Sequence, residues 1–315
     1  MKTIKVSVMA AIAIILMTAG CKKESSTSGP DNYSGLSGFY AANGAQMQHY
    51  SVDAAAGGNF TSPQGTVVTI PPNSFFNQSG GAVTGTVDID FKDIYNKSDM
   101  LMSDVSTIGF FGAPIKSGGE FYIKASQGGS ALNLTGGKAI VVRQPLNGKP
   151  IDSAMVPMRR VIDTVGHGTG MIWAINGTDT VRNSPSGYVF SLYNFNQPVD
   201  SGSWCNSDNS SYFGAYPQTT LTLLGTDTAQ YGTNVFLVFS GLNSMVHVYN
   251  GAGNSFPYNY APSGLQCTVV AVGTKGGKLY ASFTPITITP GLNVNFSLSL
   301  TTTTDFKNKL KLLDN

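Results

Sequence analysis

The sequence predicts an all-β fold with two β-sandwich domains in tandem. Three observations support this: apolar and polar residues alternate over short runs, glycine-rich turns separate the runs, and charged residues are scarce. Apolar residues make up 41% of the 315-residue chain, enough to bury sizeable cores. Charged residues make up only 11%, against roughly 25% in typical soluble domains. Neutral polar residues must therefore cover the surface, as is typical of extracellular β proteins.

The N-terminal residues indicate where the protein is located. Lys2 and Lys5 form a short positive region before a compact apolar segment, Val6–Met17, and the small residues 18–20 lead to Cys21. This pattern resembles the bacterial lipoprotein signal peptide, in which the cysteine is acylated and becomes the new N-terminus. The resemblance implies a signal peptide over residues 1–20, palmitate-type acylation of Cys21 and attachment to a membrane through that lipid.

The residues after Cys21 extend this interpretation. Lys22 and Lys23 stand where many Gram-negative lipoproteins that stay at the inner membrane carry aspartate. The resemblance therefore implies attachment to the outer membrane. The protein could face either the periplasm or the cell exterior, and the sequence does not distinguish the two. Residues 21–48 are rich in Ser, Gly and Asn without clear periodicity, and we expect them to form a flexible tether.

The first sandwich is predicted over residues 49–146. The run TVDIDF, residues 86–91, places three apolar side chains on one face and Thr and Asp on the other. EFYIKAS at residues 120–126 alternates in the same way, and AIVV at residues 139–142 is typical of a buried strand. Pairs of glycines between these runs suit hairpin turns.

Four segments of this region carry a family resemblance. They are IPPNSF, VTGTV, DMLMSDVST and SGGEFYI, which begin at residues 70, 83, 99 and 117. Together they resemble the N-terminal β-sandwich domain of Bacteroidetes-type surface lipoproteins, which is distantly similar to the sandwich shared by ankyrins, netrin receptors and zonula-occludens scaffolds. The resemblance covers roughly residues 55–145. It implies an architecture and brings no catalytic residues.

The second half is predicted to hold a connecting segment, residues 147–186, followed by a second sandwich over 187–304 and a tail over 305–315. The connecting segment mixes polar, Pro and Gly residues and can contain strands of its own. The family resemblance implies an immunoglobulin-like second domain, opened by a Trp-Asn-Asp segment that matches Trp204 and Asn206 with a cysteine between them. The clearest strand is LNVNFSLSL, residues 292–300. A short helix is expected within 305–313.

Two cysteines remain once Cys21 is assigned to the lipid. Cys205 and Cys267 form an even pair in an oxidising compartment, so a disulfide between them and two buried free thiols are both open. A bridge would close a loop of about 60 residues and stabilise the fold by roughly 4 kcal/mol.

Charge and residue types limit the function. The formal net charge is +2, and removal of Lys2 and Lys5 with the signal peptide brings it to zero, so we expect no nucleic-acid partner. The only glutamates among the 17 acidic residues are Glu24 and Glu120, and no spacing nominates a catalytic pair. The sequence therefore predicts a non-enzyme without catalytic residues, metal or cofactor. A calcium site among the aspartates at residues 88–104 remains an open alternative.

Aromatic residues in two polar loops are the candidate ligand-binding side chains. Trp204, Tyr212, Phe213 and Tyr216 lie among Ser and Asn, and Tyr258 and Tyr260 lie in a second such loop. Exposed aromatic rings could form a platform for a glycan. Burial of Trp204 in the core of the second domain is the favoured alternative for that residue. The sequence thus predicts a binding or scaffold protein whose partner is a glycan or another envelope protein.

Overall fold

The structure is a computed structural model that describes residues 31–163, 170–195, 203–226 and 228–315. Asp31–Asn315 form one compact unit, and most of its regular structure is β-strand, which confirms the predicted all-β fold. Among the described residues no helix is long and apolar enough to span a membrane. The signal peptide predicted over residues 1–20 and the lipidation site Cys21 lie outside the described residues.

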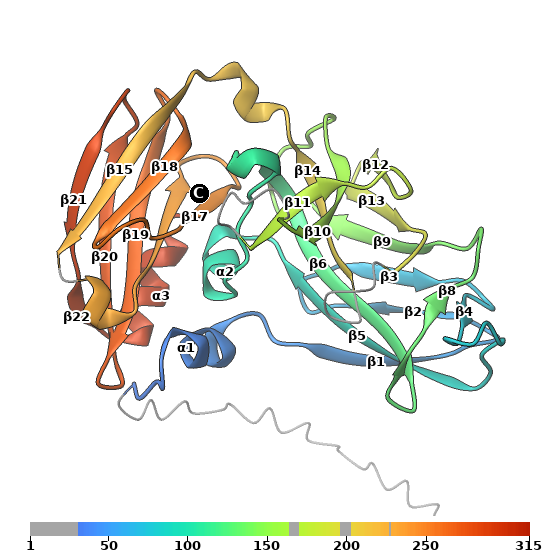
Figure 1. The fold of residues 1–315 in the computed structure, drawn as a ribbon. Helices are drawn as coiled ribbons and strands as arrows, with labels where there is room; N and C mark the ends of the chain where they lie inside the picture. The colour runs from blue at the N-terminus through green and yellow to red at the C-terminus, as the bar shows by residue number, and fades with distance from the viewer. Residues whose placement is uncertain (1–30, 164–169, 196–202, 227) are drawn as a thin grey trace, which may run out of the picture. The chain divides into compact units, whose positions relative to one another are not determined.

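The first sandwich consists of two antiparallel sheets and a small two-stranded one (Figure 1). The larger sheet has the order β1-β5-β6-β14-β10-β11, with β7 beside β6, and the facing sheet has the order β12-β13-β9-β3-β2. β4 pairs with β8. The strand bounds are β1 Gln48–Asp53, β2 Gly58–Thr61, β3 Val67–Ile70, β4 Phe75–Phe76, β5 Thr86–Ile94, β6 Lys116–Gln127, β7 Ser130–Ala131, β8 Asn133–Leu134, β9 Ile140–Pro145, β10 Val156–Ile162, β11 Met171–Ile175, β12 Thr180–Ser184, β13 Gly187–Leu192 and β14 Ser203–Asn209.

The alternation seen in the sequence forms the core of this sandwich. Val87, Ile89 and Phe91 of β5 are fully buried, whereas Thr86 and Asp88 of the same strand are exposed. The buried side chains contact apolar residues of β6 and of the facing sheet in one continuous cluster. Period-two patterning thus decides which face of β5 lies inside.

The second sandwich packs a three-stranded sheet, β18-β15-β21, on a five-stranded one, β17-β16-β19-β20-β22. β15 and β21 are parallel, while the other pairs in these two sheets are antiparallel. Its core is a separate apolar cluster. The strand bounds are β15 Gln218–Thr226, β16 Asn234–Phe239, β17 Met245–Val248, β18 Ser255–Pro262, β19 Gln266–Lys275, β20 Lys278–Thr287, β21 Asn293–Ser297 and β22 Ser299–Thr301.

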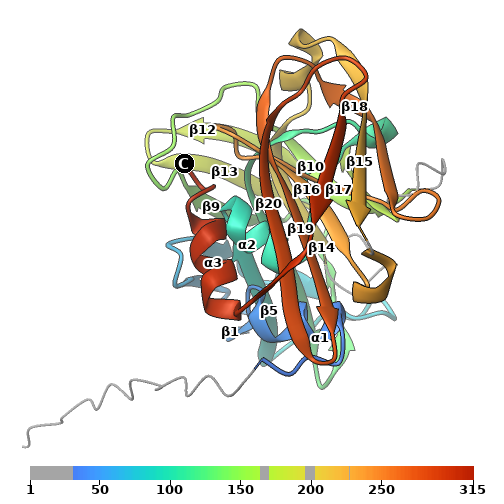
Figure 2. The same cartoon turned by 90° about the vertical axis from the view of Figure 1, so that its left-hand side faces the viewer.

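A third core joins the two sandwiches and includes residues of the helices α1 Leu36–Asn43, α2 Lys97–Met102 and α3 Thr303–Lys311. α2 and α3 lie side by side in Figure 2. In α3, the side chain of Thr302 caps the helix by accepting a bond from the Asp305 N–H, as the short predicted C-terminal helix requires. Phe39 of α1 and Phe306 of α3 are both fully buried, with ring centroids 5.8 Å apart.

The predicted tether is wrong beyond residue 30. Residues 36–43 form α1, and the carboxylate of Asp31 accepts bonds from the backbone N–H and hydroxyl of Thr303 at 2.8 and 2.7 Å. The Ser- and Gly-rich composition of this segment suggested a linker, but Leu36, Phe39 and Tyr40 form one apolar face of α1. Phe39 of this face packs against Phe306 of α3.

The predicted domain boundaries are also wrong. The connecting segment 147–186 holds β10, β11 and β12, and the first sandwich continues through β13 and β14 up to Asn209. The second sandwich therefore starts at Gln218 and not at residue 187. β14 pairs with β6, a strand about 80 residues earlier, and such distant pairing leaves no local signal in the sequence.

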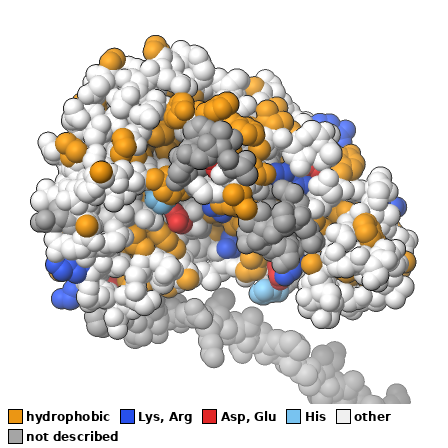
Figure 3. Space-filling model, viewed as in Figure 1, with side chains coloured by type: hydrophobic (Ala, Val, Ile, Leu, Met, Phe, Trp, Pro, Cys, Tyr) orange, Lys and Arg blue, Asp and Glu red, His pale blue; other side chains and the backbone are white. Residues whose placement is uncertain are grey.

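The strand predicted at residues 292–300 divides between two sheets. β21 pairs with β15, and after Leu298 the chain crosses to the other sheet, where β22 pairs with β20. Val294 and Phe296 are buried as expected, but Leu300 is 61% exposed because it lies beyond this crossing. The low fraction of charged residues is visible on the surface. Figure 3 shows a face covered mostly by neutral side chains and backbone, with few charged groups.

Candidate ligand pocket at the junction of the sandwiches

The structure separates the predicted aromatic residues. Phe213 is 2% exposed and belongs to the core of the second sandwich. Tyr258 is also buried there, and its hydroxyl donates to the Gly112 carbonyl at 2.9 Å. Tyr260 and Tyr216 are half-buried, and the Tyr260 ring packs against that core. The predicted aromatic platform is therefore wrong for Phe213 and Tyr258, which stabilise the fold.

Trp204 lies on β14 in the first sandwich, so the prediction that it fills the second domain's core is wrong. Its ring is half-buried on the face of the sheet that looks toward the third core. Lys92 and Arg160 lie over the ring at 5.7 and 5.8 Å from its centroid, and Tyr122 contacts its edge. These contacts place Trp204 in a row of amphipathic side chains across the sheet.

The two cysteines are free and cannot pair. Cys205 belongs to the core of the first sandwich and Cys267 to the core of the second, and both are buried. Burial raises the pKa of each thiol to about 12. Both side chains therefore act as small apolar groups, and the open question of a disulfide is decided in favour of free thiols.

Tyr212 is the predicted aromatic residue that lines a cavity. It belongs to the short 3₁₀ turn Tyr212–Ala215 that leads from β14 to β15. The cavity has a volume of about 210 Å³ and lies between strands of the first sandwich and the β16–β17 turn of the second. Its lining includes Lys116, Lys149, Tyr188, Tyr212 and Asn243.

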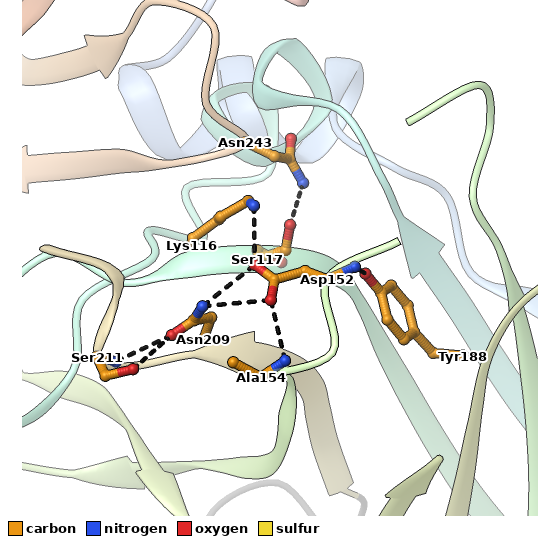
Figure 4. Close-up of polar contacts among 8 residues, drawn as sticks. All are labelled: Lys116, Ser117, Asp152, Ala154, Tyr188, Asn209, Ser211 and Asn243. Atoms are coloured by element: carbon orange, nitrogen blue, oxygen red, sulfur yellow. Dashed lines mark hydrogen bonds and ion pairs between the residues drawn. The ribbon is translucent and has the colours of Figure 1, made fainter. Parts of the chain in front are cut away.

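Lys116 lines this pocket, and it is held by an ion pair with Asp152, which lies beside the pocket lining (Figure 4). The Lys116 ammonium lies 2.8 Å from Asp152 Oδ2 and 4.9 Å from the centroid of the Tyr212 ring. Asn209 Nδ2 donates to Asp152 as well, and the Asp152 N–H donates to the Tyr188 hydroxyl at 2.8 Å. The Lys116 ammonium is thus held by Asp152, and Asp152 is held in turn by Asn209 of β14 and Tyr188 of β13.

The second sandwich closes the pocket through Asn243. Its side-chain Nδ2 donates to the Ser117 carbonyl and its own carbonyl accepts from the Ser117 N–H, both at 2.9 Å. This reciprocal pair continues the edge of β6 and fixes the β16–β17 turn against it. Tyr188, on β13, reaches the pocket because Gly118 leaves room: a Cβ at that position would lie 2.8 Å from the Tyr188 ring.

The electrostatics favour a fixed ion pair and neutral tyrosines. Burial opposes the charged form of Asp152, but the bonds from Lys116, the Ala154 N–H and Asn209 outweigh it and lower its pKa. Burial raises the pKa of Tyr188 and of Tyr212 and lowers the pKa of Lys149. The pocket therefore offers hydroxyl and ammonium donors beside an aromatic ring.

The acidic, His and Cys side chains of the described residues do not gather into a metal site. No three His, Cys, Asp or Glu side chains in this part of the chain are grouped as a metal site. Of the aspartates at residues 88–104, Asp93 accepts bonds from Ser62 and Thr66, and Asp104 is paired with His247, so they do not converge on a calcium ion.

Sequence reasoning found Tyr212 but missed most of the pocket. Lys116 meets Asp152, 36 residues away, and Ser117 meets Asn243, 126 residues away, only in the folded chain. No spacing rule connects them. Comparison of this chain with family models, with curated proteins and with solved structures finds no match.

Proposed function

We propose that this chain is a lipid-anchored protein of the cell envelope, located at the outer membrane, that acts as a non-catalytic binding protein. The observation that carries the binding role is the pocket at the junction of the two sandwiches, where Tyr212 lies beside the Lys116 ammonium that Asp152 holds. Concave sites with a few positioned polar groups are where small ligands usually bind. A scaffold role, with an envelope protein as partner, is the competing proposal.

The lipid anchor is supported by the N-terminal pattern ending in Cys21. Replacing Cys21 by Ser should move the protein from the membrane fraction to the soluble fraction, and the wild-type N-terminal peptide should gain the mass of its acyl chains. Fractionation and mass spectrometry check both. A Cys21→Ser protein that stays in the membrane fraction would contradict the anchor.

The ligand that the pocket suits best is the end of a glycan. Its volume of about 210 Å³ lies below the roughly 300–1,000 Å³ of pockets that hold drug-sized molecules, so it fits one small polar unit and not an extended chain. A terminal sugar combines an apolar ring face, which suits the Tyr212 ring, with hydroxyls that accept from Lys116 and Tyr188.

A glycan array with the full chain in detergent tests this proposal, with Tyr212→Ala beside wild type. Tyr193→Ala is the matched control, because Tyr193 is 38% exposed and does not line the pocket. We expect binding of a defined glycan end that falls about tenfold or more for Tyr212→Ala and stays unchanged for Tyr193→Ala. Binding that tolerates Tyr212→Ala would contradict the pocket as the site. A blank array with folded protein would favour the scaffold role.

A further inference from the structure

Two acidic side chains are fully buried without a hydrogen-bond partner. Glu120 on β6 and Asp208 on β14 are both 0% exposed, and all four of their carboxyl oxygens lack a partner in the described part of the chain. An unpaired carboxylate taken out of water costs several kcal/mol, and two close together repel each other. Nothing in the pocket described above uses these groups.

The strand register places both groups on the same face of the sheet. Glu120 lies directly opposite Asn206, and Asp208 lies opposite Ser117, with the register shifting between them. The row that contains Glu120 and Asn206 continues into Ile94 on one side and Met158 on the other, and these two belong to the core between the sandwiches. The carboxyl groups are therefore enclosed between the first and second sandwiches.

A local irregularity creates this arrangement. Gly119 has φ +132°, and a Cβ there would lie 2.3 Å from the Tyr95 ring, so only glycine fits. The irregularity places two residues of β6, Gly118 and Gly119, opposite one residue of β14, Ser207, so that Asp208 pairs with Ser117. Bulges of this kind re-aim side chains in a way that regular pairing does not.

Among the described residues, no Lys or Arg forms an ion pair with either carboxyl group. Arg160 favours the charged form of Glu120, and the Ser117 hydroxyl, which donates to Asn206 Oδ1 at 2.8 Å, also favours the charged form of Asp208. Burial raises the pKa of Glu120 well above its usual value, and burial together with Glu120 does the same for Asp208. Either protons or a bound cation must therefore balance the pair.

Asn206 is the independent observation that favours a cation. Its side chain is 0% exposed, and its Nδ2 has no acceptor although Glu120 lies opposite it and Asp208 lies two residues along the strand. If the amide turns by 180°, Nδ2 donates to the Ser117 hydroxyl and the amide oxygen replaces it on the carboxyl side. Glu120, Asp208 and Asn206 then offer five oxygens between them, and carboxylate and amide oxygens are ligands that a hard cation takes.

We propose that Glu120, Asp208 and Asn206 bind one calcium ion between the two sandwiches. Ca²⁺ takes six to eight oxygen ligands, accepts bidentate carboxylates and balances two negative charges. Mg²⁺ usually keeps several water ligands and suits an enclosed site less well, and zinc prefers His and Cys ligands. The ion links β6 to β14, next to Lys116 and Ser117 of the ligand pocket, so it also fixes the wall of that pocket.

Metal analysis and thermal unfolding of the full chain in detergent test the proposal. The chain is unfolded in chelator and refolded with Ca²⁺, with Mg²⁺ or with chelator alone. We expect about one bound Ca²⁺ per chain and a Tm that rises with Ca²⁺ but not with equal Mg²⁺. The double variant Glu120→Gln, Asp208→Asn should lose the ion and the Ca²⁺-dependent rise, yet fold in chelator, because both substitutions are neutral and of equal size.

Asp88→Asn is the matched control, because Asp88 lies on the exposed face of the neighbouring strand β5 and should keep the full response. If the double variant does not fold, terbium luminescence of the wild-type chain decides, since Trp204 lies two residues from Asn206 and can excite a bound lanthanide. Emission that Ca²⁺ removes supports the site. A wild-type chain without metal, without Ca²⁺-dependent Tm and without such emission would overturn the proposal and leave a protonated carboxyl pair.

Discussion

The two faces of the large sheet in the first sandwich differ in whether their buried charged side chains form ion pairs. On the inner face, Arg159 is 1% exposed, and its Nε donates to Asp179 Oδ2 at 2.5 Å. On the outer face, Glu120 and Asp208 are as deeply buried but have no such partner. The buried Arg159 is neutralised by an ion pair within the fold. The equally buried Glu120 and Asp208 have no ion-pair partner, which favours a bound cation or proton as the balancing group.

The largest expected effect comes from breaking the matched pair. Asp179→Asn leaves the Arg159 guanidinium buried and uncompensated, so the free energy of unfolding should fall by about 3–5 kcal/mol. Chemical denaturation of the variant and wild type measures this. Asp88→Asn, which removes an exposed aspartate, should stay within about 0.5 kcal/mol of wild type. An Asp179→Asn protein as stable as wild type would mean that the inner face tolerates unmatched charge and would remove the contrast between the faces.

The smallest expected effect concerns Cys205 on the inner face and Cys267 in the second sandwich. Because the two thiols lie in separate cores, a reducing agent should leave Tm unchanged. At pH 8 neither thiol should react with a thiol reagent in the folded protein, and both should react after unfolding. A Tm that falls on reduction would contradict the separate cores.

The pH dependence of these thiols follows from their raised pKa. The folded values near 12 exceed the ordinary value of 9.0, so below pH 9 the thiols are protonated in both states and contribute no pH dependence. Between about pH 9 and 12 the unfolded chain loses these protons first, so their contribution lowers stability as pH rises.

Part of the architecture could be predicted from the sequence because it depends on local patterns. The alternation at residues 86–91 lies within β5, and all but the first residue of the apolar run at 139–142 lies in β9. The features that the sequence did not predict depend on contacts between residues far apart in the chain. β14 returns to β6, and α1 finds its partner in α3. Lys116 meets Asp152, and Ser117 meets Asn243, only in the folded chain. Glu120, placed on a strand by its pattern, gave no sign of its unpaired carboxyl group.

The contact between α1 and α3 can form only late in the folding of a newly made chain. Asp31 and Tyr33 bond to Thr303, a separation of about 270 residues, and Phe39 packs on Phe306. A chain emerging from the ribosome or across a membrane from its N-terminus therefore carries α1 without its partner until α3, about 260 residues later, has appeared. Closure of this contact is late and slow because of the long loop that it ends. Until then the first segment of the protein remains accessible to the factors that receive newly made chains.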